Sequence, residues 1–504
     1  MNDRNYDVAI IGTGPAGMFA ALELVDRKPG IRVVMFEKGP IRPMGDKDNV
    51  TSGWGGAGAF SDGKLDLSSV VGGTVHEEIG EEAFGDLMEY VDSRYLYFGG
   101  NHDRMVDASK DPEKADRVRR LKAKSLGAGL DLRPFPIRHL GTDTAHAIVM
   151  NIRRYLMNRG VVVRTDCPVN DIEPEEPHGI TLKVGNDNTE TVRAEYVLAA
   201  PGRSGAEWMS GQARKLGLKL VNNGIDVGVR VEVLNETLKD ITDLLYESKI
   251  IYHSRKSDDK LRTFCMCPSG FVAMEDYRGL KTANGHSYAG KESANTNFAI
   301  LATQVFTEPF NDPLGYGKYI SGLANKLAGG GVLVQRLGDL RNGRRSKEEK
   351  ISQWVVKPTL LPPSAVPGDL SLAIPHRHLS AIVEMLESLE SIAPGISSDH
   401  TLMYGIEVKF YSFKVETKPG FETQIPKLYV AGDGSGYTRG LLQSSIQGVT
   451  VGRHIAERVE VAARSREMSD DDRRWEALLK MRHQDMQREL AQQEEAEKVS
   501  MESK

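Results

Sequence analysis

The sequence predicts an α/β fold in which both ends of the chain build one mainly parallel sheet and the middle forms an inserted α+β domain. Three observations support this prediction. An apolar run followed by closely spaced glycines opens the chain, and a similar arrangement occurs near residue 430. The stretch from 225 to 394 instead contains strand-like segments typical of an antiparallel sheet, separated by loops and helices.

The first forty residues predict a dinucleotide-binding turn. Residues 6–11 are apolar and β-branched, as in a buried parallel strand. Three glycines follow in G-x-G-x-x-G spacing: Gly12, Gly14 and Gly17. The first permits a tight turn, the second leaves room for a pyrophosphate, and the third lets a helix beginning near Pro15 and Ala16 lie close to the strand. The N-terminus of that helix favours the negative charge of phosphate.

A second apolar run, residues 32–36, ends at Glu37, which lies 20 residues after the last glycine of the turn, and Lys38 follows. A carboxylate at this position accepts hydrogen bonds from an adenosine ribose and repels a 2′-phosphate. Because strand, helix, second strand and acid occur in order, the motif is far more specific than an isolated glycine pattern. It predicts FAD or NAD, and not NADP.

The segment from 53 to 64 holds five glycines and few large side chains. Such a segment cannot be stabilised by its own burial, so we expect it to wrap a ligand, the alternative being a flexible surface loop. Trp54 and Phe60 favour the ligand interpretation, since they would be unusual in a solvated linker. The contacts expected from this segment are Gly56, Gly58, Ser61 and Lys64.

Residues 141–203 are expected to return to the same sheet. A helix over 141–159 precedes short strands near 161–163 and 169–172, and a turn-rich hairpin then adds a small antiparallel sheet. The second arm of the hairpin ends in the sharp turn Ala200-Pro201-Gly202-Arg203, where the backbone can approach a dinucleotide.

The inserted region contains several polar clusters. IPHRHL, with His376, and LRNGRRS are its densest polar stretches, and they either clamp a carboxylate or are ordinary solvated surface. Candidates for a general acid or base are His376, Tyr404 and Tyr411.

Cys265 and Cys267 in RTFCMCPSG would point to the same side of a strand. A redox pair or a nucleophile is one interpretation. Buried structural thiols are the favoured one, because adjacent C-x-C disulfides are strained. No metal site is predicted, since no second cysteine pair offers ligands.

Near the other end, residues 428–431 read as a buried strand that ends at Gly432 and Asp433, and a helix begins near Gly440. This turn places a carboxylate beside a helix N-terminus, which suits a sugar-alcohol chain next to a polarisable ring carbonyl. An enzyme that binds only NAD has no use for the arrangement. The two ends of the chain are therefore predicted to meet on one FAD.

Bulk properties exclude several classes of function. A net charge of −5 over 504 residues gives no indication of a nucleic-acid partner or an anionic membrane surface. No apolar run approaches the length that spans a bilayer, and the first strand begins too early to leave room for a signal peptide. Three cysteines cannot form a disulfide framework, so we expect a cytoplasmic protein.

With both glycine elements in view, the chain resembles flavoproteins of the glutathione-reductase-like fold, whose Rossmann-type FAD domain is discontinuous in sequence. More narrowly, it is similar to the uncharacterised bacterial FAD-dependent dehydrogenase family. The matching stretches are GWGGAGAFSDGKL, GTDTAHAIVMNIRRYLMNRG, RTFCMCPSGFV, QRLGDLRNGRRS, VVKPTLLPPSAVPGDL and GDGSGYTRGLLQSSIQG. The resemblance covers most of residues 1–458 in the same order.

The residues themselves predict an FAD domain over 1–224 and 395–462, a substrate domain over 225–394, and a charged C-terminal helix or tail over 463–504, expected to be disordered from 494. The resemblance implies the same discontinuous FAD domain. It also implies that Val169 flanks the adenine and that residues 440–443 lie near the pyrimidine edge of the ring. The complete set of expected cofactor contacts is Gly12, Gly14, Pro15, Ala16, Gly17, Glu37, Lys38, Gly56, Gly58, Ser61, Lys64, Val169, Ala200, Gly202, Arg203, Gly432, Asp433, Gly440, Leu441, Leu442 and Gln443.

Two departures from the family pattern stand out. Asp433 replaces the usual glutamate, and the turn Tyr437-Thr438-Arg439-Gly440 is less glycine-rich, so that Arg439 is able to place a charge near the ring. Together with three residues named above, Arg439 completes the set of candidate catalytic residues, which is His376, Tyr404, Lys64 and Arg439.

We expect an FAD-dependent oxidoreductase that transfers a hydride between a small organic substrate and flavin N5, the substrate being anionic if the arginine clusters bind it. No second dinucleotide motif is present, because the triplet at 329–331 lacks the required spacing. The other half-reaction is left to oxygen, a protein carrier or transient NAD(P)H. A flavin monooxygenase is an alternative, although it would carry an Asp-Gly motif in place of AAPGRSG. A non-catalytic flavin-binding protein is another, and a homo-oligomer or an electron-transfer partner stays open.

Overall fold

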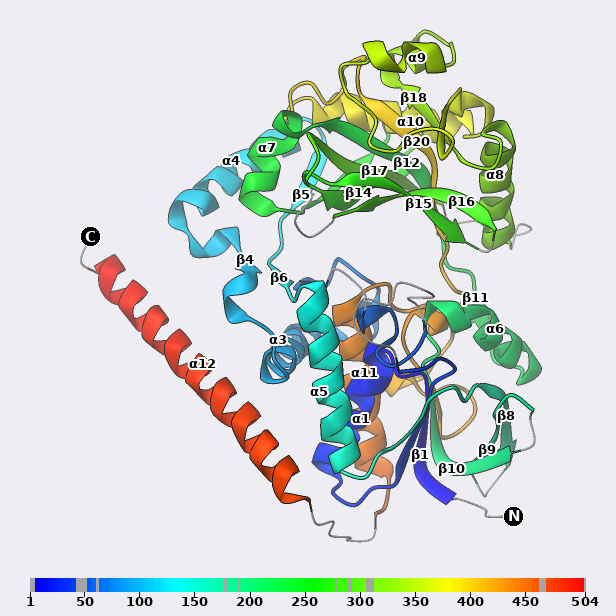
Figure 1. Ribbon diagram of the computed structural model, residues 1–504, viewed down its shortest axis with the longest axis vertical. Helices are drawn as coiled ribbons and strands as arrows, with labels where there is room; N and C mark the ends of the chain where they lie inside the picture. The colour runs from blue at the N-terminus through cyan, green and yellow to red at the C-terminus, as the bar shows by residue number, and fades with distance from the viewer. Residues whose placement is uncertain are drawn as a thin grey trace. The chain divides into compact units, whose positions relative to one another are not determined.

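The computed structural model describes residues 5–41, 52–59, 63–175, 179–187, 190–277, 279–287, 292–304, 312–461 and 468–502. The chain divides into two compact units, each described by itself (Figure 1). Unit 1 comprises Met1–Met105, Ile137–Val221 and Ser412–Lys504. Unit 2 comprises Val106–Pro136 and Asn222–Tyr411.

Unit 1 is built on a seven-stranded sheet with the strand order β7-β2-β1-β10-β9-β8, in which β22 also pairs with β10. The strands β7, β2, β1, β10 and β22 run parallel, whereas β10, β9 and β8 form an antiparallel hairpin extension. Their bounds are β1 Asn5–Ile11, β2 Val33–Phe36, β7 Val162–Arg164, β8 Val169–Glu175, β9 Gly179–Val184, β10 Glu190–Ala199 and β22 Leu428–Val430. This arrangement confirms the predicted α/β class with a parallel sheet and a small antiparallel addition.

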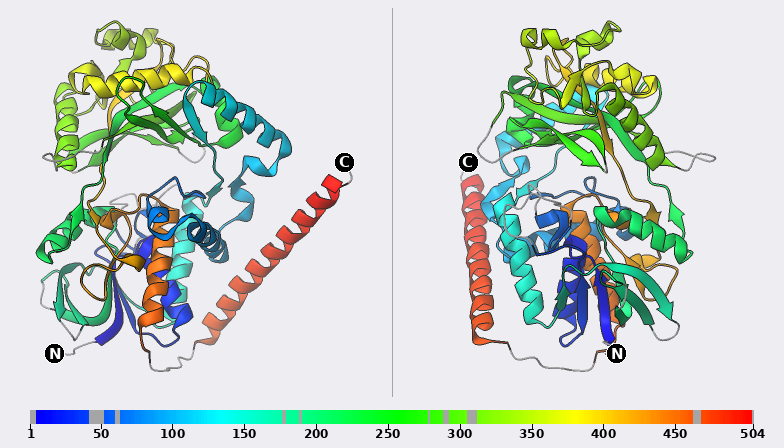
Figure 2. Two further views of the ribbon diagram at one scale, coloured as in Figure 1. Left: turned by 180° about the vertical axis from the view of Figure 1, so that it is seen from behind. Right: turned by 45° about the vertical axis from the view of Figure 1, so that its right-hand side comes forward.

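Helices α1 (Pro15–Arg27) and α11 (Leu441–Arg458) come from opposite ends of the chain and pack side by side (Figure 2). A Cβ at Gly448 would lie 2.2 Å from the carbonyl oxygen of Ala16, and one at Gly452 would lie 2.7 Å from that of Ala20. The two glycines of α11 therefore allow the helices to approach backbone to backbone, which brings their N-termini to the same region of the sheet.

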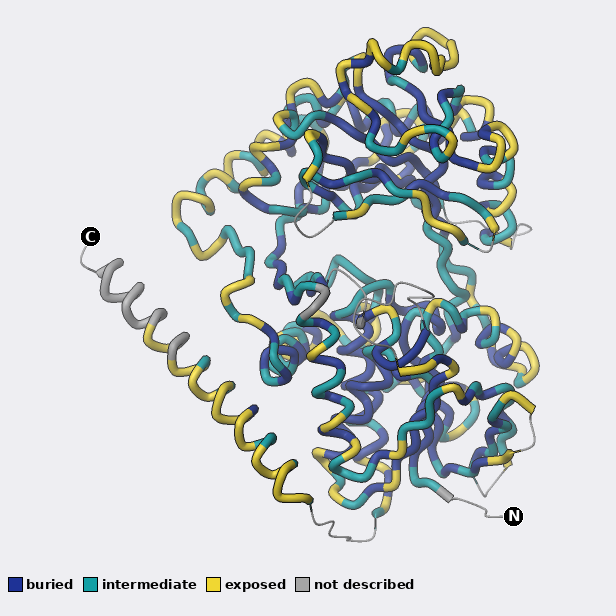
Figure 3. The backbone as a smooth tube through the Cα atoms, in the orientation of Figure 1, coloured by how far each residue is buried: buried dark blue, intermediate teal, exposed yellow. Residues whose placement is uncertain are grey.

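The other elements of unit 1 surround this core. Figure 3 shows that β1, α1 and α11 run through buried surroundings. The remaining elements are η1 Gly56–Ala59, β3 Lys64–Asp66, α2 Val75–Ile79, α3 Glu81–Tyr97, η2 His102–Arg104, β6 Ile137–His139, α5 Thr142–Asn158, η4 Arg203–Gly205, α6 Ala206–Lys215, β11 Leu220–Val221, β21 Lys414–Val415, η7 Pro419–Phe421, η8 Asp433–Ser435 and α12 Asp470–Glu502.

The C-terminal segment is helical as far as Glu502, which corrects the expectation of a disordered end from residue 494. Helix α12 starts with the Ser469 hydroxyl accepting a hydrogen bond from the Asp472 amide at 3.1 Å. Its first turns are held by ion pairs from Arg154 to Asp472 and from Arg159 to Glu476. Alanine, glutamate, glutamine and lysine then continue the helix, since all four are strong helix formers. Among the described helices, none is long and apolar enough to cross a membrane.

Unit 2 is built on an eight-stranded sheet with the order β19-β18-β20-β12-β17-β14-β13-β5, beside a separate hairpin of β15 and β16. The strands are β5 Leu130–Arg133, β12 Ile225–Leu234, β13 Lys249–His253, β14 Lys260–Cys267, β15 Phe271–Tyr277, β16 Leu280–His286, β17 Asn295–Gln304, β18 Val332–Arg336, β19 Ala365–Pro367 and β20 Leu402–Lys409. The helices are α4 Pro112–Gly127, α7 Asn235–Leu245, α8 Pro313–Leu327, α9 Leu337–Arg341 and α10 His376–Leu389, with η3 Ala108–Lys110, η5 Glu348–Gln353 and η6 Leu370–Leu372, while β4 Met105–Val106 joins the units.

The two faces of β12 differ in chemistry, because successive side chains of a strand point to opposite sides. The odd-numbered valines from 227 to 233 belong to an apolar core shared with α7, α8 and α10. The other face carries Asp226, Arg230 and Glu232, all of them buried. We call this second side the polar face of β12.

The division into units differs from the predicted boundaries in two places. Residues 106–136 belong to unit 2, because β5 pairs with β13. The chain enters unit 1 again at Ser412 and not at 395, because β20 pairs with both β12 and β18. Both differences arise from pairing between strands that are distant in sequence.

The ion pair of Asp226 on the polar face predicts a measurable loss of stability in acid. Burial by itself would raise the pKa of Asp226, but the Arg262 guanidinium and the hydroxyl donors Thr303 and Tyr411 outweigh it and lower the pKa to about 2. The unfolded value is near 4, so the pair stabilises the fold above about pH 4 and its contribution is lost as the pH falls toward 2. We expect the free energy of unfolding to fall by about 2 kcal/mol in this window from this group.

Urea titrations between pH 5 and about 2 test this expectation. The Asp226→Asn protein should lack this part of the acid sensitivity, although it is less stable at neutral pH because it leaves Arg262 buried without its carboxylate. Tyr411→Phe serves as the milder companion, since it keeps the ion pair and removes one donor. The pKa of Asp226 should then lie closer to its unfolded value, so less stability is lost in acid and the loss is complete at a higher pH. Identical pH profiles for the wild-type and Asp226→Asn proteins would contradict the prediction.

Candidate functional site

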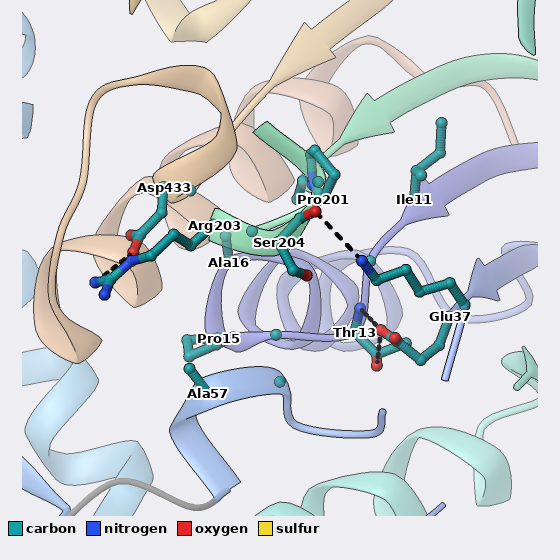
Figure 4. Close-up of a pocket in the computed structure, with 18 of the residues that line it drawn as sticks. Ile11, Thr13, Pro15, Ala16, Glu37, Ala57, Pro201, Arg203, Ser204 and Asp433 are labelled. Atoms are coloured by element: carbon teal, nitrogen blue, oxygen red, sulfur yellow. Dashed lines mark hydrogen bonds and ion pairs between the residues drawn. The ribbon is translucent and has the colours of Figure 1, made fainter. Parts of the chain in front are cut away.

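Unit 1 contains a cavity of about 380 Å³ at the carboxyl ends of β1, β2, β10 and β22 (Figure 4). Both ends of the chain contribute to it, as predicted. The predicted residues that line it are Gly12, Gly14, Pro15, Ala16, Glu37, Lys38, Gly56, Gly58, Val169, Ala200, Gly202, Arg203, Gly432, Asp433, Arg439, Gly440 and Leu441. Open α/β sheets bind ligands outside the carboxyl ends of their strands, so this is the expected place for one.

The three glycines of the first turn have different roles. Gly12 has φ +98°, and a Cβ there would lie 2.1 Å from the carbonyl oxygen of Ala200, so only glycine fits between β1 and β10. A Cβ at Gly17 would lie 2.1 Å from the Gly12 carbonyl oxygen, and Gly17 does not line the cavity. Among the described residues, no atom outside its two chain neighbours lies within 4 Å of the ideal Cβ position of Gly14. The backbone at Gly14 is therefore open to a ligand.

Helix α1 presents its N-terminus to the cavity. Its N-cap is Gly14, which supplies no side-chain hydrogen bond, and its first turn contains no acidic residue. Pro15, which has no amide proton, occupies the first helical position. The amides that follow are thus left for an anionic ligand, and the helix dipole adds to the attraction.

Glu37 is buried, and its carboxylate organises the backbone around the turn. One oxygen accepts hydrogen bonds from the Thr13 amide at 3.2 Å and the Thr13 hydroxyl at 2.9 Å. The other accepts from the amides of Gly39 at 3.1 Å and Gly53 at 2.9 Å. The predicted ribose contact therefore has a structural role that the sequence did not indicate, since the same carboxylate already holds three separate segments.

The glycine-rich segment packs against the first turn. A Cβ at Gly56 would lie 3.3 Å from Cα of Gly14, and one at Gly58 would lie 3.0 Å from Cγ of Pro15 and 3.2 Å from Cδ1 of Leu441. The Trp54 indole is buried and donates to the Val149 carbonyl oxygen at 2.8 Å, which anchors the segment. Ser61 and Phe60 lie outside the described residues.

The carboxy-terminal corner closes the opposite side. Gly432 has φ +75° and its amide donates to the Gln447 side chain at 2.8 Å. Asp433 accepts a hydrogen bond from the Thr438 hydroxyl at 2.8 Å and lies 3.5 Å from a guanidinium nitrogen of Arg203. Figure 4 shows Arg203 directed toward Asp433. The turn after β10 and the corner after β22 are therefore joined through side chains as well as through strand pairing.

Helix α11 also points its N-terminus at the cavity, with Gly440 as an N-cap that makes no side-chain hydrogen bond. Gln443 does not line the cavity. Its amide nitrogen donates to the carbonyl oxygens of Ser69 and Val71, both at 2.8 Å, and its oxygen accepts from the Val75 amide at 3.0 Å. Gln443 thus fixes the segment before α2. Leu442 is buried and, like Lys64 on β3, lies outside the cavity lining.

The remaining catalytic candidates belong to unit 2. His376 is exposed at the start of α10, where Nε2 lies 3.2 Å from the Ser380 hydroxyl. Tyr404 is fully buried and donates to Glu232 at 2.5 Å. Burial, followed by the charge of Glu232, raises the pKa of Tyr404 well above its usual range. Tyr411 donates to Asp226.

Both polar clusters of unit 2 are engaged by the protein itself. In IPHRHL, Arg377 binds Asp259 through two hydrogen bonds of 2.6 and 2.7 Å. In LRNGRRS, Arg344 pairs with Asp339 at 2.9 Å. These arginines therefore have carboxylate partners within unit 2, which favours a structural role over the anion clamp.

Sequence reasoning missed part of the cavity lining, including the wall beside Val169. The lining residues not predicted are Ile11, Thr13, Phe36, Ala57, Cys167, Pro168, Asn170, Ser204, Gly205, Trp208 and Ser444. Trp208 lies on α6 and donates to the Asn170 carbonyl oxygen at 3.1 Å, so it tightens the wall that contains Val169. Burial raises the pKa of the Cys167 thiol and keeps it protonated at neutral pH. The aromatic residue just after AAPGRSG was the available signal for this wall.

The residues present fit FAD. Two helix N-termini border the cavity, of which that of α1 is suited to a pyrophosphate and that of α11 to a ring carbonyl. Gly14 leaves space where a phosphate needs it, and the lining combines backbone amides with apolar side chains.

Comparisons with known proteins agree with this fit. Residues 7–222 match the model of the FAD dependent oxidoreductases, and residues 224–410 match that of the FAD-dependent protein, C-terminal domain-like family. An uncharacterised protein from Clostridium beijerinckii is 24% identical over 490 residues, covering 90% of this chain and 81% of the relative. Among solved structures, glycine oxidase from Geobacillus kaustophilus is 14% identical with a TM-score of 0.34, covering 92% of this chain and 100% of its own. The FrdA subunit of Escherichia coli quinol fumarate reductase is 14% identical with a TM-score of 0.36, covering 96% of this chain and 74% of its own.

The fold, the cavity and the family matches together identify the chain as an FAD-dependent oxidoreductase. The match to the C-terminal domain-like model of FAD-dependent proteins lies within its second unit. The expectation of a flavoenzyme is thereby confirmed, and the alternative of a non-catalytic flavin-binding protein is not favoured.

Proposed function

We propose that the enzyme is a dehydrogenase or reductase that moves a hydride between a small organic substrate and FAD, and that it belongs to the uncharacterised FAD-dependent dehydrogenases of the glutathione-reductase-like group. Bound FAD supplies the hydride-accepting ring. The observation that carries the proposal is the pair of helix N-termini, each capped only by glycine, at one cavity built from both ends of the chain.

The N-terminus of α11 supports the hydride-transfer chemistry. Its unpaired amides and dipole stabilise negative charge where reduction would place it, on the pyrimidine side of the ring. Arg439 lines the cavity beside Gly440, and its own amide donates to the Gly72 carbonyl oxygen at 2.7 Å, which holds this turn in place. We propose Arg439 as the cation that assists reduction. Lys64, His376 and Tyr404 remain further candidates.

The second half-reaction is proposed to use oxygen, a protein carrier or transient NAD(P)H. A single dinucleotide motif in the sequence supports an exchange partner that leaves after reaction. The substrate is proposed to be a small organic molecule. The carboxylate partners of the arginines in unit 2 argue against those arginines as its anchor.

Anaerobic reduction of the flavin tests this function. The purified holoenzyme is mixed with a panel of hydroxy acids, amino acids, enoates, NADH and NADPH, and the visible flavin absorbance is followed. We expect one chemical class to bleach the flavin, or to reoxidise flavin that was first reduced. The Arg439→Met protein should retain FAD but react about tenfold more slowly, because one cation near the ring is lost.

Two other outcomes would contradict the proposed function. Hydroxylated product formed with equal consumption of oxygen would replace the proposal by monooxygenase chemistry. Flavin that stays oxidised with every substrate, yet is reduced by dithionite, would contradict the proposed hydride transfer with these substrate classes.

A further inference from the structure

Cys265 and Cys267 lie together at the end of β14 in unit 2. Their sulfur atoms are 4.0 Å apart. The pairing of β14 with β17 shifts register between Phe264 and Cys267, so the two cysteines occupy a bulge, and Cys265 has φ +46°. A non-glycine residue held in this left-handed region is uncommon and tends to mark a functional position. Cys265 is partly exposed, whereas Cys267 is buried.

A buried arginine is directed at this cysteine pair. Arg230, on the polar face of β12, is fully buried and reaches across β17. Its Nη2 donates to the Cys265 carbonyl oxygen at 2.7 Å and to the Cys267 sulfur at 3.3 Å. Its Nε donates to the Asn297 side chain at 2.8 Å. The guanidinium is therefore fixed in orientation, with one edge against the sulfur.

The space around the guanidinium is shaped for it. A Cβ at Gly285 of the β15–β16 hairpin would lie 1.6 Å from Nη2 of Arg230, so any larger residue would displace the guanidinium. Arg230 shares its counter-ion, Glu407, with a second cation. A Glu407 carboxylate oxygen lies 3.6 Å from Nη1 of Arg230, and the other lies 3.0 Å from the Lys409 ammonium. Two cations thus share one carboxylate, which leaves positive charge beside the sulfurs.

The electrostatics agree with this geometry. Burial lowers the pKa of Arg230, but negative charge on Glu407, Cys267 and Cys265 raises it more, so the pKa lies above its usual range. A guanidinium that donates a hydrogen bond to a sulfur favours negative charge on that sulfur.

We propose that Cys265 and Cys267 form a redox-active dithiol, with Cys267 held as a thiolate by Arg230, and that hydroperoxides oxidise it to an intrachain disulfide. The partly exposed Cys265 sulfur attacks one peroxide oxygen, the O–O bond breaks, and the other oxygen leaves with a proton as water. Cys267 then attacks the sulfur of the resulting sulfenic acid and releases a second water. Two thiols lose two electrons, hydrogen peroxide gains them, and an external thiol reverses the reaction.

Thiol mapping of the full-length holoenzyme tests the proposal. The reduced protein is treated with stoichiometric hydrogen peroxide, quenched, denatured, alkylated with N-ethylmaleimide and analysed by mass spectrometry. With three cysteines in the chain, we expect three labels before oxidation and one afterwards, on Cys167. A peptide joining Cys265 to Cys267 should appear, and dithiothreitol should restore all three labels.

Variants separate this role from a merely structural one. Cys265→Ser and Cys267→Ser should fold and retain flavin but give no crosslinked peptide, whereas Cys167→Ser should crosslink like the wild type. Arg230→Lys keeps the positive charge but loses the planar guanidinium whose nitrogens have fixed directions. Crosslinking should slow by about tenfold, because one unit of thiol pKa changes the thiolate fraction by that factor. If Arg230→Lys does not fold, the serine variants still decide the matter. Equal labelling of all three cysteines after peroxide, or added oxygen at Cys265 without a crosslink, would overturn the proposal.

Discussion

Replacing Gly14 with valine is expected to give a folded protein that is purified without flavin. Gly14 has φ −71° and ψ −176°, an extended conformation that L-residues adopt freely. In the described part of the chain, no atom beyond its two neighbours lies within 4 Å of its ideal Cβ, so the new side chain costs little there. It would instead occupy the space beside the α1 N-terminus that the pyrophosphate needs. We expect FAD binding to weaken on the order of 100-fold, or about 3 kcal/mol.

The measurement pairs flavin content with the stability of the apoprotein. FAD released by denaturation gives the occupancy, titration of apoprotein with FAD gives the affinity, and thermal unfolding of both apoproteins gives the structural cost. Gly211→Val is the matched control, since Gly211 is exposed on α6 and also meets no atom within 4 Å. Full flavin occupancy in Gly14→Val would show that the pyrophosphate does not lie at this turn.

Glu37→Ala is expected to lower both the stability and the FAD affinity. The substitution removes the acceptor of the Thr13, Gly39 and Gly53 amides and of the Thr13 hydroxyl. A buried donor left without an acceptor costs about 1–3 kcal/mol, and water entering the space recovers part of it. We therefore expect a loss of about 3 kcal/mol in the free energy of unfolding. A carboxylate that only contacted the ribose would leave the free energy of unfolding unchanged.

Urea unfolding of the apoprotein and FAD titration separate the two roles of Glu37. Glu195→Ala is the control for the same substitution, because the ion pair of Glu195 with Lys427 is exposed and should change stability by less than about 1 kcal/mol. Glu37→Gln keeps one acceptor oxygen and should fall between the alanine variant and the wild type. Reduced stability with unchanged FAD affinity would leave Glu37 with only the structural role, and unchanged stability would contradict the hydrogen-bond network.

The residues that were predicted well are those whose role depends on local geometry. Gly12 and Gly432 have positive φ values, and a nearby strand and helix define what such a glycine does. Gln443 shows the limit of such expectations, because the family resemblance placed it near a ring whereas its side chain binds the segment from Ser69 to Val75. A long polar side chain has several directions open to it, and only packing selects one.

The boundaries of the units show the same limit at a larger scale. The segment 130–133 alternates apolar and polar residues as any half-buried strand does. This pattern does not predict that the segment pairs with β13. Strand β12 lies in the stretch that was expected to contain strands. The sequence did not indicate, however, that its charged residues would have buried partners on β14, β17 and β20.

By itself, the sequence determined the class of fold, the FAD cofactor and the two backbone corners that border the cavity, because glycine spacing and short apolar runs constrain the chain within a few residues. Only the tertiary structure decided which side chains share a space: Glu37 with Gly53, Arg203 with Asp433, and Arg230 with Cys267. The physical reason is that these contacts depend on strand register and helix packing between distant segments, and a local pattern contains no information about either.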